Sequence, residues 1–406
     1  MLTTRTRSLA AAVAVSALAL SACGGSDSSG SDGDGPFRVL VTGGLSAQGA
    51  LAANAQTSVL AAQAGAQVQN EVGGIGGRQI ELTVVDDGGD ATKAVTELRN
   101  AISSGNAPDL FLNSGPSSVG AAVLPILNQN DILSFNIAPT QDSTDPSKFP
   151  LNFDLAPGAG DNADGIVEHM REQGYSTVGV IHGSTAYGEE FGREMERAVD
   201  DAGLRLARNE EYDVASLDMT PQLQSLKNAG AEALAVDAYG APLGYLLQSL
   251  QRLDWDVPLI GNTSVAGTAL VAHAPPNGVL GTPEVANLVV QVFASTVYDP
   301  EDEAVNTMVE TMASLGTITS PLILADNYDA FPLVAAAAEA AGTTTDAEKL
   351  AQALETPEVL EAAKTAFLPR YHFSADSHGP APDADALRFI APTALVDGQF
   401  GNPAAS

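Results

Sequence analysis

The chain has 406 residues, with 18 basic and 50 acidic side chains and a formal net charge of −32. A surface this acidic repels the phosphates of nucleic acids, which argues against nucleic-acid binding. The single cysteine leaves no pair for an internal disulfide or a cysteine-rich zinc site, and a chain of this length usually divides into two domains.

The N-terminus has the pattern of an export signal. Arg5 and Arg7 precede an apolar run at residues 9–20, and small residues lead from it to Cys23. The run is about 12 residues long, too short to span a hydrocarbon core that needs about 20. This order is typical of bacterial lipoproteins. We therefore expect residues 1–22 to be removed and Cys23 to carry a lipid that anchors the extracytoplasmic protein to the cell membrane; an ordinary secreted protein is the alternative.

The next segment predicts a tether, and the chain after it predicts alternating strands and helices. Residues 24–35 are rich in Gly, Ser and Asp, which favours a flexible linker. Predicted strands at 37–41, 80–85, 109–113 and 132–137 then alternate with predicted helices at 50–72, 93–103 and 117–127. Such alternation predicts a parallel sheet with helices on both faces.

The same pattern restarts in the second half. It gives predicted helices at 166–173, 189–202, 221–229 and 243–253, and predicted strands at 178–181, 206–212, 233–236 and 258–261. The later segment 288–293 and the predicted helices at 302–314 and 326–341 exceed what this half needs, so we expect the chain to cross back into the first lobe. The predicted fold is α/β, with two doubly wound parallel-sheet lobes joined by a multi-strand hinge. The predicted divisions are a lipid anchor and linker at 23–35, a first lobe at 36–156, a second lobe at 157–284, a return to the first lobe at 285–369, and a C-terminal segment, 370–406, mainly in the second lobe.

The segments beyond the predicted strand ends indicate binding more than catalysis. Ligands of open parallel sheets lie at these ends. The segments are residues 42–44, 114–118, 138–140, 182–187, 237–240 and 262–264. They offer hydroxyls, backbone amides and aromatic rings, with one carboxylate and one imidazole. This inventory suits holding a small molecule, so we expect no enzyme.

Several of these stretches resemble the Leu/Ile/Val-binding type of periplasmic binding protein, a type I fold. The stretches are residues 73–82, 86–90, 114–118, 132–140, 187–191, 328–330, 373–379 and 396–400. The resemblance implies the extracytoplasmic receptor of an ABC importer, which captures a small ligand by hinge closure and delivers it to permease subunits. The implied ligand is an amino acid or a related small carboxylate or amide. We expect a monomer without a cofactor or metal.

The resemblance also implies a carboxylate site on the first lobe. The loop matching Ser117 and Ser118 and the segment matching Ala138 and Thr140 bind the ligand carboxylate in this family. The predicted helix that opens at Ser117 would supply free amides and a positive dipole end. These two serines alternatively serve only as helix caps. Tyr187 matches a second-lobe tyrosine that closes over the ligand.

The departure from the family concerns the ligand ammonium. Thr263 stands where the amino-acid binders carry an acidic residue. An enclosed ammonium without a counter-charge costs several kcal/mol. Either the ligand is not an α-amino acid or another acid substitutes, and Asp237, beside Tyr239, is the first candidate; Asp326 and Asp161 are weaker ones. We expect Thr263, Asp237 and Tyr239 all to contact the ligand.

Three other functions remain open. The same architecture would serve a ligand-sensing surface receptor without a transport role. An exported hydrolase would need a nucleophile elbow, but Val119 stands where the elbow around Ser117 requires glycine. His372, Asp376 and His378 could be considered as metal ligands, although the family shares this terminal segment without metal.

Overall fold

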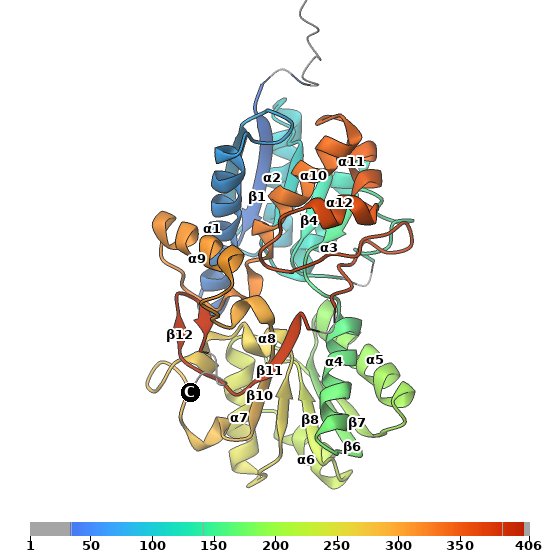
Figure 1. Cartoon of the computed structure of the whole chain (residues 1–406). Helices are drawn as coiled ribbons and strands as arrows, with labels where there is room; N and C mark the ends of the chain where they lie inside the picture. The colour runs from blue at the N-terminus through green and yellow to red at the C-terminus, as the bar shows by residue number, and fades with distance from the viewer. Residues whose placement is uncertain (1–32, 34, 141, 384, 402–406) are drawn as a thin grey trace, which may run out of the picture. The chain divides into compact units, whose positions relative to one another are not determined.

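The computed structural model describes residues 33, 35–140, 142–383 and 385–401, so the predicted signal peptide, Cys23 and most of the predicted tether lie outside the described residues. Two main sheets organise the described chain (Figure 1). The first has the order β2-β1-β3-β4-β5, with all neighbours parallel. Its strands are β1 (Phe37–Gly43), β2 (Ile80–Asp86), β3 (Leu110–Asn113), β4 (Leu133–Asn136) and β5 (Asn152–Asp154).

The second sheet has the order β11-β10-β9-β8-β6-β7. Only β11 runs antiparallel to its neighbour within this described sheet. Its strands are β6 (Thr177–Gly183), β7 (Arg205–Tyr212), β8 (Ala233–Val236), β9 (Leu259–Gly261), β10 (Leu288–Phe293) and β11 (Leu387–Ile390). We use first lobe and second lobe for these two sheets with the helices that cover them.

The strand order predicts where a ligand would bind in each lobe. In both sheets the second strand lies on one side of the first strand and the third lies on the other, so the order reverses between β1 and β3 and between β6 and β8. Ligands of doubly wound sheets bind outside the carboxyl ends at this reversal. The predicted α/β class with doubly wound parallel sheets is confirmed.

Helices cover the first sheet on both faces because its strands alternate their apolar side chains. Leu40 and Phe111 lie on the face covered by α2 (Ala91–Ser103) and α3 (Ser117–Gln129). Their neighbours Val39, Val41 and Leu112 belong to the larger core cluster that includes α1 (Ala50–Glu71). Successive side chains of a strand point to opposite faces, so a strand apolar throughout is buried on both.

The second sheet repeats this arrangement. Val178 and Val180 of β6 pack with α4 (Ala159–Glu172) and α5 (Ala186–Asp201). Leu234 and Val236 of β8 belong to the larger cluster, together with apolar residues of α6 (Thr220–Asn228) and α7 (Ala241–Arg252). A short helix, α8 (Thr263–Ala266), follows β9, with 3-10 turns at Ala269–Ala272 (η1) and Pro283–Val285 (η2).

After β10 the chain returns to the first lobe. Helices α9 (Glu303–Leu315) and α10 (Ala330–Ala341) contact α1, as Figure 1 lets the reader follow. The other elements between β10 and β11 are η3 (Ala294–Thr296), η4 (Leu322–Leu324), η5 (Asp326–Tyr328), α11 (Ala347–Leu354) and α12 (Pro357–Ala362). The hairpin of β12 (Leu395–Val396) and β13 (Gln399–Phe400) follows β11. β10 falls inside the range 285–369 assigned by sequence to the return, but its hydrogen bonds place it in the second sheet. The predicted lobe boundaries otherwise stay a prediction.

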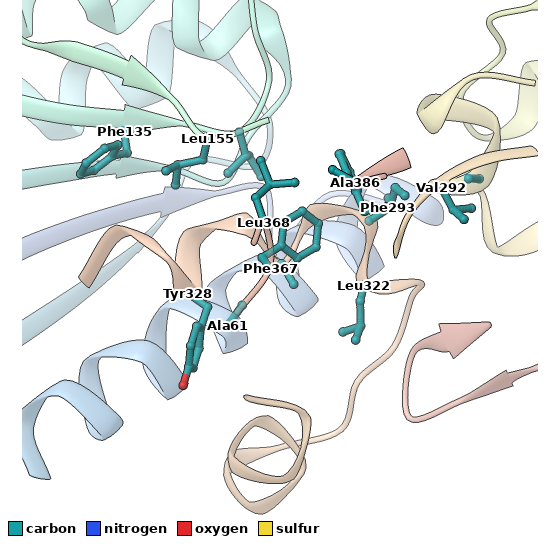
Figure 2. Close-up of a cluster of buried hydrophobic side chains, with 14 of the residues drawn as sticks. Ala61, Phe135, Leu155, Val292, Phe293, Leu322, Tyr328, Phe367, Leu368 and Ala386 are labelled. Atoms are coloured by element: carbon teal, nitrogen blue, oxygen red, sulfur yellow. The ribbon is translucent and has the colours of Figure 1, made fainter. Parts of the chain in front are cut away.

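A hydrophobic cluster lies where the chain passes between the lobes. Figure 2 shows Phe135 and Leu155 of the first lobe, Val292 and Phe293 of the second, and Phe367 of the returning segment within it. The Phe293 and Phe367 rings meet edge to face, with their centroids 4.8 Å apart. The crossing segments are therefore part of one packed core. Among the described helices, none has both the length and the apolar character needed to cross a membrane.

Candidate ligand-binding site

A cavity of about 430 Å³ opens at the carboxyl ends of strands from both sheets. Segments that follow strands of the first lobe supply one part of its lining, and segments that follow β6 to β10 supply another. The polar lining consists of Asn54, Ser114, Ser117, Thr185, Tyr187, Tyr212, Asp237, Tyr239, Thr263 and Ser264. The larger side chains of the apolar lining are Leu51, Ile137, Pro139, Val214, Pro242, Phe293, Ile323 and Leu324. A cavity that is mostly apolar with a few polar groups is typical of a small-molecule site.

The structure brings together six of the eight predicted ligand residues. They are Ser117, Ala138, Tyr187, Asp237, Tyr239 and Thr263. Ser118 and Thr140 are not part of the lining. The Thr140 amide donates to Ser143 Oγ at 2.8 Å, so this amide is already satisfied. Whether any of these eight residues contacts a ligand stays a prediction.

The first-lobe side of the cavity offers amide donors at the start of α3. Pro116 precedes the helix, and its carbonyl accepts hydrogen bonds from Val119 and Gly120. Within the described part of the chain, the amides of Ser117 and Ser118 have no acceptor. Free amides at the positive end of a helix favour an anion. By contrast, the Ala138 amide already donates to Asn136 Oδ1 at 3.1 Å.

Ser114 is a lining residue to which sequence reasoning gave too little weight. It follows β3 directly, is 5% exposed, and belongs to the predicted loop 114–118. Its Oγ lies 2.8 Å from Asn327 Nδ2, which donates to it, and 3.1 Å from Ser58 Oγ. Its position immediately after a strand was the available signal. Its partners Ser58 and Asn327, far away in sequence, gave none.

Asp237 is the one side chain in the lining that carries a formal charge at neutral pH. It is 4% exposed, and its Oδ1 accepts a hydrogen bond of 2.9 Å from Asn262 Nδ2. Its Oδ2 lies 3.4 Å from the amide nitrogen of Gly183, at the end of β6. The Asn262 bond brings the Asp237 carboxylate beside the loop of Thr263. A carboxylate is thus present near Thr263, supplied by the end of the neighbouring strand β8 and not by position 263 itself.

Two tyrosines of the second lobe contribute neutral hydroxyls. The Tyr187 hydroxyl accepts a hydrogen bond of 2.9 Å from Asn162 Nδ2, and the Tyr239 hydroxyl accepts one of 2.6 Å from Asn54 Nδ2. Burial raises the pKa of Tyr239 to about 12. Burial, with a smaller contribution from the charge of Asp237, raises the pKa of Tyr187 well above its usual value. Both side chains are therefore protonated phenols at neutral pH.

Other titratable groups considered from the sequence lie outside this lining. Asp161 accepts a hydrogen bond from the Gly158 amide at the start of α4, and Asp326 is completely buried. His378 is buried, with ring nitrogens 2.8 Å from the Asn152 carbonyl oxygen and 3.0 Å from Glu355 Oε1. No group of three or more His, Cys, Asp or Glu side chains suited to a metal ion occurs among the described residues.

The lining holds no histidine, lysine or arginine, so no imidazole or amine in it stands beside Ser117 as a base. His182, which follows the predicted strand 178–181, is buried with Nδ1 3.2 Å from the Gly183 carbonyl oxygen. The arrangement can hold a small molecule between neutral donors and one carboxylate. It does not assemble a nucleophile with its base.

Comparisons with known proteins agree with this geometry. A family model described as periplasmic binding protein matches residues 41–388. The leucine-, isoleucine-, valine-, threonine- and alanine-binding protein of Pseudomonas aeruginosa is 25% identical over 301 residues, which cover 71% of this chain and 75% of that protein.

Solved structures share the fold at lower sequence identity. An extracellular ligand-binding receptor from Rhodopseudomonas palustris superposes with a TM-score of 0.73 at 18% identity, covering 91% of this chain and 99% of that one. A solute-binding protein of an ABC transporter from R. palustris, in complex with benzoate, has a TM-score of 0.64 at 18% identity and covers 79% and 86%. The resemblance inferred from the sequence is confirmed. With a family model spanning most of its length and a cavity at the strand ends of two doubly wound sheets, the chain belongs to the periplasmic binding protein family, a family of extracytoplasmic solute-binding proteins.

Proposed function

We propose that this protein is the receptor of an ABC importer and captures a small amino acid by closing its two lobes around it. The ligand carboxylate would lie against the start of α3 and Ser114, and the ligand ammonium against Asp237. The observation that carries this proposal is that Asp237 is the single formal charge in a lining otherwise made of neutral donors and apolar groups. A zwitterionic amino acid would place its carboxylate on the neutral donors and its ammonium group on Asp237.

The charge of the lining argues against the nearest alternative, a carboxylate without an ammonium group. The cavity offers such an anion no cation, and Asp237 would repel it. A structural neighbour holds benzoate, and the binding protein of Pseudomonas aeruginosa is named for five amino acids. L-leucine and benzoate are therefore the two informative probes.

The test is a pair of charge-removing variants. Asp237→Asn should weaken L-leucine binding roughly ten- to a hundredfold, since a hydrogen bond to a charged group contributes about 1.5–3 kcal/mol. Glu189→Gln removes an exposed charge on α5 outside the lining and should leave binding unchanged. Isothermal titration gives the dissociation constants, and the rise in melting temperature with ligand checks them by linkage.

A preference for benzoate over L-leucine in the wild type, strengthened in Asp237→Asn, would contradict the amino-acid ligand. Ser114→Ala should weaken both probes, because both carry a carboxylate. An effect of Ser114→Ala on neither probe would contradict the position assigned to the carboxylate.

We also propose that Cys23 holds the protein at the cell membrane and that the captured ligand is passed to permease subunits. The export pattern of residues 1–22 supports the anchor. Cys23→Ser should move the protein from the membrane fraction into the soluble fraction. Loss of L-leucine uptake on deletion of the protein supports transport; unchanged uptake, with binding intact, favours a sensing receptor.

A further inference from the structure

Asn54, on α1 of the first lobe, reaches across to the second lobe beside the cavity. Its Nδ2 donates to the Tyr239 hydroxyl at 2.6 Å and to the Gly267 carbonyl oxygen at 3.0 Å. A carbonyl oxygen can only accept, so the nitrogen of this amide, and not its oxygen, must face the second lobe. Both hydrogens of Nδ2 are then in use.

This orientation determines which hydrogen bonds Tyr239 can still make. The phenol oxygen accepts from Asn54, and among the described residues no acceptor receives the phenol proton. Burial raises the pKa of Tyr239 to about 12, so the proton is retained at neutral pH. Because Tyr239 lines the cavity, the proton of its hydroxyl is available there for donation to a ligand.

The same face of α1 also contacts Ser114, the hydroxyl on the first-lobe side of the cavity. Ser58 lies four residues after Asn54, one helical turn along the same face, and its Oγ is 3.1 Å from Ser114 Oγ. One face of α1 thus contacts a hydroxyl of each lobe: Asn54 contacts Tyr239, and Ser58, one turn further along, contacts Ser114. Both hydroxyls line the same cavity, one from each lobe.

A buried asparagine at position 54 lowers the stability of the fold, which argues against a purely structural role. It is 1% exposed, its Oδ1 has no partner among the described residues, and its neighbours in the lining include Leu51 and Ala55. A buried polar atom without a hydrogen bond destabilises the fold, whereas an apolar side chain would fill this position without that cost.

We propose that Asn54 is a positioning residue of the binding site: it orients the Tyr239 hydroxyl as a donor and thereby selects ligands whose carboxylate, held on the first lobe, also offers an oxygen acceptor to this hydroxyl. This inference rests on the proposed function. It adds a residue that acts through Tyr239 and does not itself need to touch the ligand.

Asn54→Asp tests the direction of the hydrogen bond. A carboxylate at this position accepts the Tyr239 proton and removes it from the cavity. In the full chain, L-leucine should bind roughly tenfold or more weakly to Asn54→Asp and also to Tyr239→Phe. If Asn54 acts through Tyr239, the double variant Asn54→Asp/Tyr239→Phe should bind L-leucine less than about twofold more weakly than Tyr239→Phe alone.

The matched control is Asn70→Ala on the same helix. Asn70 exchanges hydrogen bonds with the backbone of Ile80 and lies outside the cavity lining, so its loss should lower the melting temperature without changing L-leucine affinity. Unchanged affinity in Asn54→Asp, or effects that multiply with those of Tyr239→Phe, would overturn the inference.

A measurement without ligand separates this inference from the proposed function. With tyrosine labelled at Cζ, the NMR resonance lost in Tyr239→Phe identifies Tyr239. It should move in Asn54→Ala and stay in place in Asn70→Ala. If the wild type binds neither L-leucine nor benzoate, the proposed function fails. A Tyr239 resonance that Asn54→Ala does not move overturns the inference whether or not a ligand binds.

Discussion

Asp154, at the end of β5, shows how a buried carboxyl group is accommodated by its hydrogen bonds. It is completely buried and accepts hydrogen bonds from Asn136 Nδ2 at 3.0 Å and Asn152 Nδ2 at 3.1 Å, both on Oδ1. Its Oδ2 is paired with Ser143 Oγ, which also lies 2.9 Å from the Thr140 carbonyl oxygen. One hydroxyl proton cannot serve both acceptors, so a protonated Asp154 that donates to Ser143 completes the network. Burial correspondingly raises the pKa of Asp154 to about 7.

This assignment predicts a pH dependence of folding. Between about pH 4 and pH 7 the folded protein holds the Asp154 proton while the unfolded chain, with a pKa of about 3.9, does not. Stability contributed by this proton is full at low pH and is lost as pH rises toward 7. Asp154→Asn places an amide nitrogen where the protonated oxygen donates, so it should retain the contacts. It should raise the free energy of unfolding at pH 8 by up to about 4 kcal/mol relative to the wild type.

Urea denaturation from pH 4 to pH 8 measures this difference, with the exposed Glu81 of edge strand β2, changed to Gln, as the control. Asp329, whose pKa burial raises to about 6, also contributes to the wild-type profile, so the comparison uses the difference between variants. Parallel profiles for the wild type and Asp154→Asn would contradict a protonated Asp154.

At the scale of elements, α1 packs unusually close to η5 and α10. A Cβ atom on Gly65 would lie 2.6 Å from Phe331 Cδ2 and 2.7 Å from the Tyr328 carbonyl oxygen. Glycine inside a helix costs about 1 kcal/mol relative to alanine, and here it permits the close approach of the returning chain to α1. Gly244 in α7 differs, because its Cβ would meet only Leu270 Cδ2, at an ordinary 3.5 Å.

The two glycines therefore predict opposite results. Gly65→Ala should lower the free energy of unfolding by about 2 kcal/mol or more through overpacking. Gly244→Ala should leave it unchanged or raise it by up to about 1 kcal/mol. Guanidinium denaturation of both variants measures this contrast. Equal effects would show that the packing around α1 is looser than described.

At the scale of the whole molecule, the excess of acidic side chains opposes folding. The formal charge of −32 is only locally relieved by ion pairs, and those of Arg197 with Asp164 and Asp201 are exposed and individually weak. Within the described residues the chain passes between the lobes after β5, after β10 and before β11. These three crossings hold the two lobes together against the repulsion between like charges.

Screening this charge should stabilise the protein. Raising sodium chloride from about 10 mM to about 150 mM shortens the Debye length from about 30 Å to about 8 Å, so the melting temperature should rise. Calorimetry measures the shift, and a neutral osmolyte at equal osmolality controls for solvent effects. A lower melting temperature in salt would mean that the ion pairs outweigh the net repulsion.

The sequence predicted regular elements well and short polar ones poorly. The alternation of strands and helices predicted both doubly wound sheets. β5 escaped prediction because two of its three residues, Asn152 and Asp154, are polar and are buried only through their hydrogen bonds. The segment 326–341, predicted as one helix, begins instead with the turn η5, and the Asp329 carboxylate accepts from the amides of Ala366, Phe367 and Leu368.

The sequence by itself determined the family, the sheet class and most of the cavity, because residues that follow a parallel strand stay at its carboxyl end through covalent connection. Six of the eight predicted residues line the cavity for that reason. Only the tertiary structure decided which donors remain available. The Thr140 amide is satisfied by Ser143, and the Tyr239 hydroxyl is oriented by Asn54, a residue 185 positions away on the other lobe. Contacts of that separation depend on how the two lobes pack, and no local spacing along the chain encodes them.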